Sequence, residues 1–150
     1  MDRERPVLDQ LNLVAGDMDA TLAFYRVLGV EIDDVPPEWA AWAPHHQNQR
    51  HSPANRGSEL EFDSAEFAPY YDRGWGGGPG TVIGFRVSSR EAVDATFNAL
   101  IEAGYPASQA PYDAFWGARY AIVVDPDGRH VGIMSPRDPS LATAPPPPPR

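Results

Sequence analysis

The feature that most constrains this chain is a strand-like segment followed by a helix-like segment and a glycine, a pattern that occurs twice. The first copy runs from Leu8 to Gly29, with Asp17 as a typical N-cap, and the second runs from Val82 to Gly104. In each copy, apolar residues recur first at every second position, as in a half-buried strand, and then at helical spacing. Further apolar segments follow both copies. The pattern therefore predicts an α+β protein of two tandem βαβββ modules.

Glycine and proline mark the predicted boundaries. Module 1 covers about residues 7–71, a flexible glycine-rich linker covers 72–80, and module 2 covers about 81–136. Together they form a single domain, 1–136, and the proline-rich tail, 137–150, is predicted to be disordered. Helices cover only one face of such a sheet, so the other faces bury each other, enclose a cleft or meet a second subunit.

The second half of module 1 is less regular. We expect a strand to start at Val30–Ile32 and another over Trp39–Gln47, interrupted by Pro44 and followed by a polar hairpin loop. A further strand is expected over Ser58–Phe62 and a short helix over Ala65–Tyr71.

Module 2 ends in a predicted β-hairpin. Two apolar runs, Tyr120–Val124 and Val131–Met134, flank Asp125–Gly128, whose sequence DPDG is typical of a tight turn. Just before the hairpin, three aromatic residues lie within Tyr112–Trp116 in what we expect to be a loop. Such a loop either fills a core or lines an apolar pocket.

Composition excludes several classes of function. The 150 residues include 12 Lys and Arg against 21 Asp and Glu, and the net charge of -9 argues against nucleic acid or an anionic membrane as a partner. Because the chain has no cysteine, disulfides, zinc–thiolate sites and thiol catalysis are excluded. The N-terminus lacks the apolar core of a signal peptide, and no apolar run is long enough to span a membrane. We therefore expect a cytoplasmic protein.

The sequence resembles the vicinal oxygen chelate superfamily, also called the glyoxalase/bleomycin-resistance/extradiol-dioxygenase superfamily. The resemblance is carried by LDQLNLVAGDMDATLAFYRVLGVEI, FRVSSREAVDATFNALIEAGY and DPDGRHVGIMSP, and it covers about Leu8 to Pro136. It implies the glyoxalase/bleomycin-resistance fold, in which curled mixed sheets surround a ligand cup, and it implies a homodimer.

Metal-dependent members of that superfamily take ligands from four strand positions that face the cup. Carried over to this sequence, these positions fall on Gln10, Glu61, Val82 and Gly132. An isopropyl group and a hydrogen atom cannot coordinate a cation, so we expect no metal and no other cofactor, and we expect Gly132 to leave free volume in the cup. The alternative is a divalent metal at a displaced site that uses His46 or His130 with Gln10 and Glu61.

The predicted ligand-binding residues are polar groups on cup-facing strands and aromatic side chains that stack on planar or cationic compounds. They are Gln10, Asn12, Trp39, Trp42, His46, Glu61, Tyr112, Phe115, Trp116, Tyr120 and Met134. Core packing remains the alternative for each aromatic residue. Gln10 and Asn12 either bind a ligand or tie strands together, and a solvated strand position is slightly favoured for Glu61 over a role as base or cation partner. No catalytic residue is assigned.

Three functions remain open. The preferred one is a metal-free small-molecule-binding protein of the bleomycin-resistance kind, which sequesters an aromatic or cationic compound such as an antibiotic. The second is a metal-dependent lyase, isomerase or dioxygenase of the same superfamily with a displaced metal site. The third is a protein-interaction module, for which the proline-rich tail is the only support.

Overall fold

The computed structural model describes residues 4–51 and 58–150. Its elements, in chain order, are β1 (Val7–Ala15), α1 (Met18–Leu28), the 3-10 helix η1 (Pro37–Trp42), β2 (His46–Asn48), β3 (Glu59–Ser64), α2 (Ala68–Tyr71), β4 (Gly80–Arg86), α3 (Arg90–Glu102), β5 (Ala107–Asp113), β6 (Arg119–Val124), β7 (His130–Met134) and the 3-10 helix η3 (Pro139–Leu141). None of the described helices is long and apolar enough to cross a membrane.

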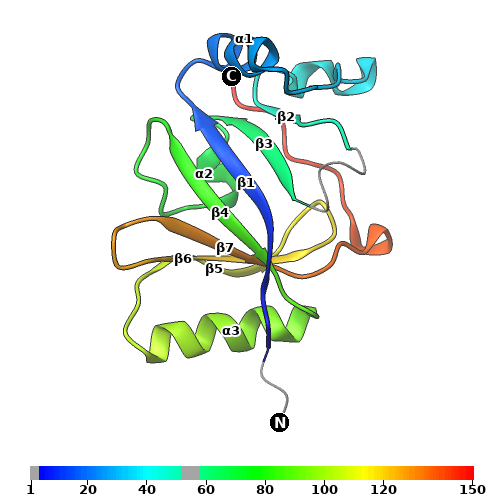
Figure 1. Ribbon diagram of the computed structural model, residues 1–150. Helices are drawn as coiled ribbons and strands as arrows, with labels where there is room; N and C mark the ends of the chain where they lie inside the picture. The colour runs from blue at the N-terminus through cyan, green and yellow to red at the C-terminus, as the bar shows by residue number, and fades with distance from the viewer. Residues whose placement is uncertain (1–3, 52–57) are drawn as a thin grey trace.

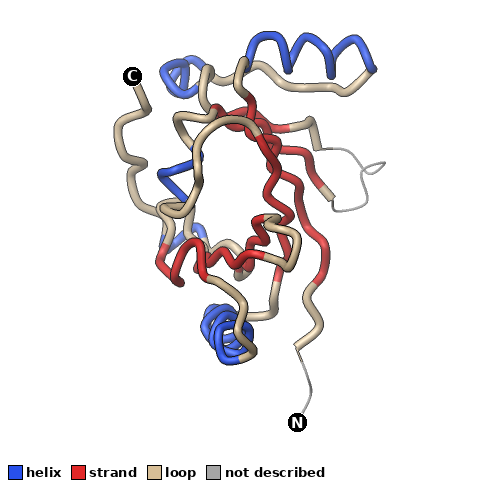
Figure 2. Tube along the Cα trace, turned by 90° about the vertical axis from the view of Figure 1, so that its left-hand side faces the viewer, coloured by secondary structure: helices blue, strands red, loops and turns tan. Residues whose placement is uncertain are grey.

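The strands form one mixed seven-stranded sheet in the order β2-β3-β1-β4-β7-β6-β5 (Figure 1). The two modules meet at the antiparallel pair of β1 and β4, and each of these strands has a parallel neighbour from its own module, β3 and β7 respectively. Figure 2 shows that the sheet curls around a central space. The predicted α+β class and curled mixed sheet are therefore confirmed.

The two longer helices, α1 and α3, cover the outer face of the sheet. α1 begins at Asp17, whose side chain accepts a hydrogen bond from the backbone N–H of Ala20, and it ends at Gly29 in the left-handed conformation. α3 packs on β5, β6 and β7 and buries Val93 and Phe97 there (Figure 1). Because both helices lie outside, the inner face of the sheet is left to line the central space.

The irregular half of module 1 differs from the prediction. Val30–Ile32 does not start a strand and contributes only an isolated bridge between Ile32 and Gln49. The predicted strand Trp39–Gln47 is wrong for most of its length, because η1 occupies its first part and only β2 remains at its end. Pro37 explains this difference, since proline favours the first turn of a helix. The centre of the predicted hairpin loop, 52–57, lies outside the described residues.

The segment before the hairpin of module 2 also differs. The first two residues of the expected loop, Tyr112 and Asp113, belong to β5, an edge strand that pairs with β6, and the other three form the turn before β6. Pro111 within β5 lacks the N–H that a central strand needs, so the sequence pattern did not predict a strand here. The predicted hairpin itself is present as β6 and β7.

The first residue of the linker, Asp72, is attached to module 2. Asp72 is completely buried, and its carboxylate lies 2.6 Å from Nδ1 of His130 and accepts a hydrogen bond from the Ser108 hydroxyl. Both Ser108 and Asp72 contact the same ring nitrogen of His130, which is not the relay geometry of a nucleophilic triad. This cluster therefore fixes the linker to β5 and β7.

We predict that Asp72→Ala lowers the free energy of unfolding by about 3–5 kcal/mol, because it removes one partner of a buried polar cluster. The measurement is equilibrium unfolding in urea. Asp127→Ala, in the exposed turn between β6 and β7, is the matched control and is expected to change stability by less than about 1 kcal/mol. Equal effects of the two substitutions would contradict a structural role for Asp72.

Candidate functional site

The inner face of the curled sheet lines a cavity of ≈ 520 Å³, within the range of small-molecule sites. Its apolar wall comes from segments that are far apart in the sequence: η1 and the residues before it, the two ends of α2, the turn between β5 and β6, the last two strands and the C-terminal segment. The apolar residues of this wall are Val35, Pro36, Trp39, Trp42, Phe67, Tyr71, Phe115, Trp116, Tyr120, Met134 and Pro145. Aromatic rings therefore form most of the apolar wall.

Ten of the eleven predicted ligand-binding residues line this cavity. The exception is Tyr112, which packs behind the wall against Tyr120 and donates a hydrogen bond to the backbone carbonyl of Tyr71. Asp63, Phe67, Tyr71 and Arg137 are among the residues that line the cavity without having been predicted from the sequence. Asp63 is two positions beyond Glu61 and shares its face of β3, so extending the predicted strand past Phe62 identifies it.

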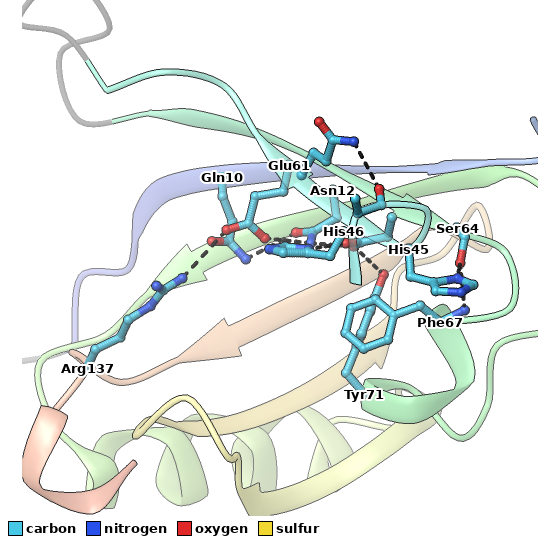
Figure 3. A network of polar contacts seen from close by, with 12 residues as sticks. Gln10, Asn12, His45, His46, Glu61, Ser64, Phe67, Tyr71 and Arg137 are labelled. Atoms are coloured by element: carbon cyan, nitrogen blue, oxygen red, sulfur yellow. Dashed lines mark hydrogen bonds and ion pairs between the residues drawn. The ribbon is translucent and has the colours of Figure 1, made fainter. Parts of the chain in front are cut away.

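The polar floor of the cavity is a hydrogen-bonded network on β1 and β3 (Figure 3). Asn12 is paired with Glu61 in the parallel register, and its Nδ2 donates to Glu61 Oε2 at 2.8 Å and to Asp63 Oδ2 at 2.9 Å. Gln10 Nε2 donates to Asn12 Oδ1 at 3.1 Å. Asn12 therefore ties β1 to β3, which was one of the two roles predicted for it, and Gln10 supports the Asn12 amide from the same strand.

Asp63 is the centre of this network. Its carboxylate is completely buried and accepts hydrogen bonds from the Asn12 amide and from the Tyr71 hydroxyl at 2.8 Å. His46 Nδ1 lies 2.6 Å from its second oxygen. Burial alone lowers the pKa of His46, but the hydrogen bond and charge of Asp63, with the charge of Glu61, outweigh burial and raise this pKa to about 9. His46 is therefore a cation at neutral pH.

Glu61 has one carboxylate oxygen that the protein does not satisfy. Oε2 is bound by Asn12, whereas Oε1 is buried and has no hydrogen-bond partner among the described residues. The nearest cation, Arg137, is 3.6 Å away, beyond hydrogen-bond length. Burial, with the charge of Asp63, raises the pKa of Glu61 against the opposing charges of His46 and Arg137. The prediction of a solvated Glu61 is wrong, because the residue is only 4% exposed.

The four positions inherited from metal-dependent relatives do not fit a divalent cation. Gln10 and Glu61 line the cavity, but Val82 is completely buried in the core. A Cβ added to Gly132 would lie 2.7 Å from the Tyr120 hydroxyl oxygen. The predicted free volume at Gly132 is therefore filled by the ring of Tyr120.

A displaced metal site has no ligand set in the described part of the chain. No group of three or more His, Asp or Glu side chains is placed to hold a metal ion there. His46 uses Nδ1 for Asp63, and His130 does not line the cavity. Of the four carried-over positions, only Gln10 and Glu61 supply donors to the cavity, and one amide with one carboxylate is too small a ligand set for a divalent cation.

The family model of the Glyoxalase/Bleomycin resistance protein/Dioxygenase superfamily matches residues 7–133. This chain belongs to that superfamily. The match spans both modules, so the predicted family is confirmed. No curated protein matches the sequence.

Solved structures support the glyoxalase fold. An NAD-dependent benzaldehyde dehydrogenase from Legionella pneumophila has a TM-score of 0.58 at 18% identity, covering 84% of this chain and 96% of that one. A Mn(II)-bound glyoxalase from Novosphingobium aromaticivorans has a TM-score of 0.60 at 18% identity, covering 89% of this chain and 40% of that one. Methylmalonyl-CoA epimerase in complex with methylmalonyl-CoA and NH4+ has a TM-score of 0.52 at 19% identity, covering 87% and 94%. At these identities the likeness shows the fold alone.

We predict that His46 makes the stability of this superfamily member depend on pH. Because its pKa is raised from 6.5 to about 9 in the folded state, its stabilising contribution is complete below pH 6.5 and is lost as the pH rises through 9. The His46 side chain is 34% exposed, so solvent screening reduces the contribution to on the order of 1–2 kcal/mol. Urea unfolding of wild type and His46→Gln at pH 6 and pH 9.5 measures it.

The stability difference between these two proteins should be larger at pH 6 than at pH 9.5. Asn48→Gln, at an exposed position of the same strand, is the matched control and should follow the wild-type pH profile. A His46→Gln difference that is the same at both pH values would contradict a charged His46–Asp63 pair.

Proposed function

We propose that this protein binds a small aromatic compound in the cup and holds it by stacking and by a hydrogen bond to Glu61, without a metal. The observation that carries the proposal is Oε1 of Glu61, which is buried at the floor of an aromatic cavity and accepts no hydrogen bond from the described residues. A buried polar atom without a hydrogen bond costs free energy, which a donor group on a ligand recovers. The required ligand has a flat apolar body and one hydroxyl, amide or amine.

The arrangement of the rings supports a planar ligand. Trp42 and Phe115 face each other across the wall with ring centroids 6.4 Å apart and planes inclined by 36°. The other neighbours of these rings meet them nearly edge-on, as Trp116 does with Phe115. Edge-on packing among wall residues leaves ring faces available for a ligand to stack on.

Binding without turnover, as in sequestration of an aromatic or cationic antibiotic, is our preferred form of this function. The superfamily also contains enzymes, and the raised pKa of Glu61 favours a second candidate in which this carboxyl group transfers a proton to or from the bound compound. A metal-dependent lyase, isomerase or dioxygenase is less favoured because the ligand positions do not fit. A protein-interaction module is also less favoured, because the cup contains a cavity instead of a filled core.

We predict that 1-naphthylmethanol binds in the cup and that Trp116→Ala weakens its binding. Loss of one stacking surface is worth about 0.5–1.5 kcal/mol, so the dissociation constant should rise by about 2-fold to 13-fold. Isothermal titration calorimetry measures both constants. Trp75→Ala, at a tryptophan outside the cavity lining, is the matched control and should bind like the wild type. Absence of binding, or equal weakening in both variants, would refute the aromatic cup.

We also predict that removing metal leaves this binding unchanged. The protein is dialysed against EDTA, its metal content is measured, and the titration with 1-naphthylmethanol is repeated with and without added Mn²⁺ or Zn²⁺. The dissociation constant should be the same in all cases, since the polar floor uses its donors within the network. A stoichiometric metal that survives dialysis, or binding that requires the added cation, would favour the metal-dependent alternative.

A further inference from the structure

The C-terminal segment forms part of the cup. After β7 the chain returns to the end of the molecule that carries α1 and η1 (Figures 1 and 2). We call residues 137–145 the strap. It is attached to the turn that carries two wall aromatics, because the backbone N–H of Asp138 donates to the Gly117 carbonyl at 2.9 Å and that of Thr143 to the Phe115 carbonyl at 2.8 Å. Disorder was predicted here from the prolines alone; the structure instead shows these hydrogen bonds.

The turn is shaped to receive the strap. Gly117 has φ +88, a conformation that favours glycine, and a Cβ at this position would overlap the carbonyl oxygen of Asp138. The two ends of the strap, Arg137 and Pro145, both line the cavity. The strap therefore places one charged side chain and one proline ring at the ligand site.

Among the charged groups around the cavity floor, Arg137 is held only by a long ion pair. His46 and Asp63 form a direct pair in which Asp63 is completely buried. The Arg137 guanidinium, in contrast, lies 3.6 Å from Glu61 Oε1, and its side chain is 53% exposed. An ion pair this long and this exposed contributes little, about 0–1 kcal/mol in comparable cases. Arg137 is therefore the one of these partners that a ligand displaces most easily.

We infer that Arg137 is an internal competitor for Glu61 and determines the charge specificity of the cup, so that a ligand carrying a protonated amine or a guanidinium takes its place. This inference rests on the proposed function. When the ligand cation replaces the Arg137 guanidinium, two cations, the ligand and His46, still lie beside the two carboxylates of Glu61 and Asp63. An anionic group at the same place would add a third negative charge beside a buried carboxylate, which is unfavourable. A neutral donor would share Oε1 with the guanidinium that remains.

The test compares three naphthalene compounds that differ in charge: 1-naphthylmethylamine, 1-naphthylmethanol and 1-naphthoate. Titration calorimetry at pH 7 and low salt gives the three dissociation constants for each protein. In the wild type we expect the amine to bind more tightly than the alcohol, and the alcohol more tightly than the carboxylate. Arg137→Gln should tighten amine binding by about 2-fold to 5-fold, the range for loss of an exposed ion pair, and weaken carboxylate binding.

Glu61→Gln should remove the preference for the amine over the alcohol. Adding Arg137→Gln to Glu61→Gln should change amine binding no further, because both substitutions act on the same contact. Arg137→Lys keeps the charge and should remain closer to the wild type than Arg137→Gln. Arg129→Gln, in the exposed turn after β6, is the matched control and should leave all three constants unchanged. Thermal unfolding of each variant verifies that the fold is intact.

The possible outcomes distinguish failure of the Arg137 inference from failure of the proposed function. If the three compounds bind and Arg137→Gln leaves the ratio of amine to alcohol affinity unchanged, the competitor role is refuted and the aromatic cup stands. The same holds if the carboxylate is the tightest ligand of the wild type. If none of the three compounds binds, the proposed function itself fails.

Discussion

The geometry of the cup depends on one buried charge, the carboxylate of Asp63. Three elements are held to it: β1 through Asn12, β2 through His46 and α2 through Tyr71. A carboxylate in an apolar interior is stable only when it is paired and hydrogen-bonded, so these partners are fixed in position by its electrostatic requirement. Asn12 donates one amide hydrogen to Asp63 and the other to Oε2 of Glu61. Because the Asn12 amide bonds Oε2, Oε1 of Glu61 is left without a hydrogen bond from the described residues.

Periodicity in the sequence predicts the parts of the fold that long regular elements form. The alternation in β1 and the helical spacing in α3 were sufficient for the tandem modules, because burial of one face imposes these patterns. Short elements were not predictable in this way. β2 has three residues, too few for a period, and β5 carries Pro111, whose cost is avoided only because β5 lies at a sheet edge.

The candidate site also has parts that the sequence pattern predicts and parts that it does not. Alternation places Gln10, Asn12 and Glu61 on the inner face from sequence alone, and clustering of aromatics identifies most of the wall. The burial of Glu61 and the position of Arg137 were not predictable, since each depends on contacts between residues far apart in the chain. The linker and the tail are the clearest cases. Composition suggested flexibility, but Asp72 and Asp138 attach them through specific hydrogen bonds.

Two glycines explain how this superfamily's fold carries a cup without the inherited ligand set. Gly84 and Gly132 are paired on β4 and β7, and each lies under a side chain: a Cβ would approach Gln10 Cγ to 2.6 Å at Gly84 and the Tyr120 hydroxyl to 2.7 Å at Gly132. The position of the Tyr120 ring therefore depends on the absence of a side chain at Gly132. A carboxylate at position 132 would have to displace Tyr120 from the wall. Restoring a carboxylate at this position would therefore remove part of the apolar surface of the cup.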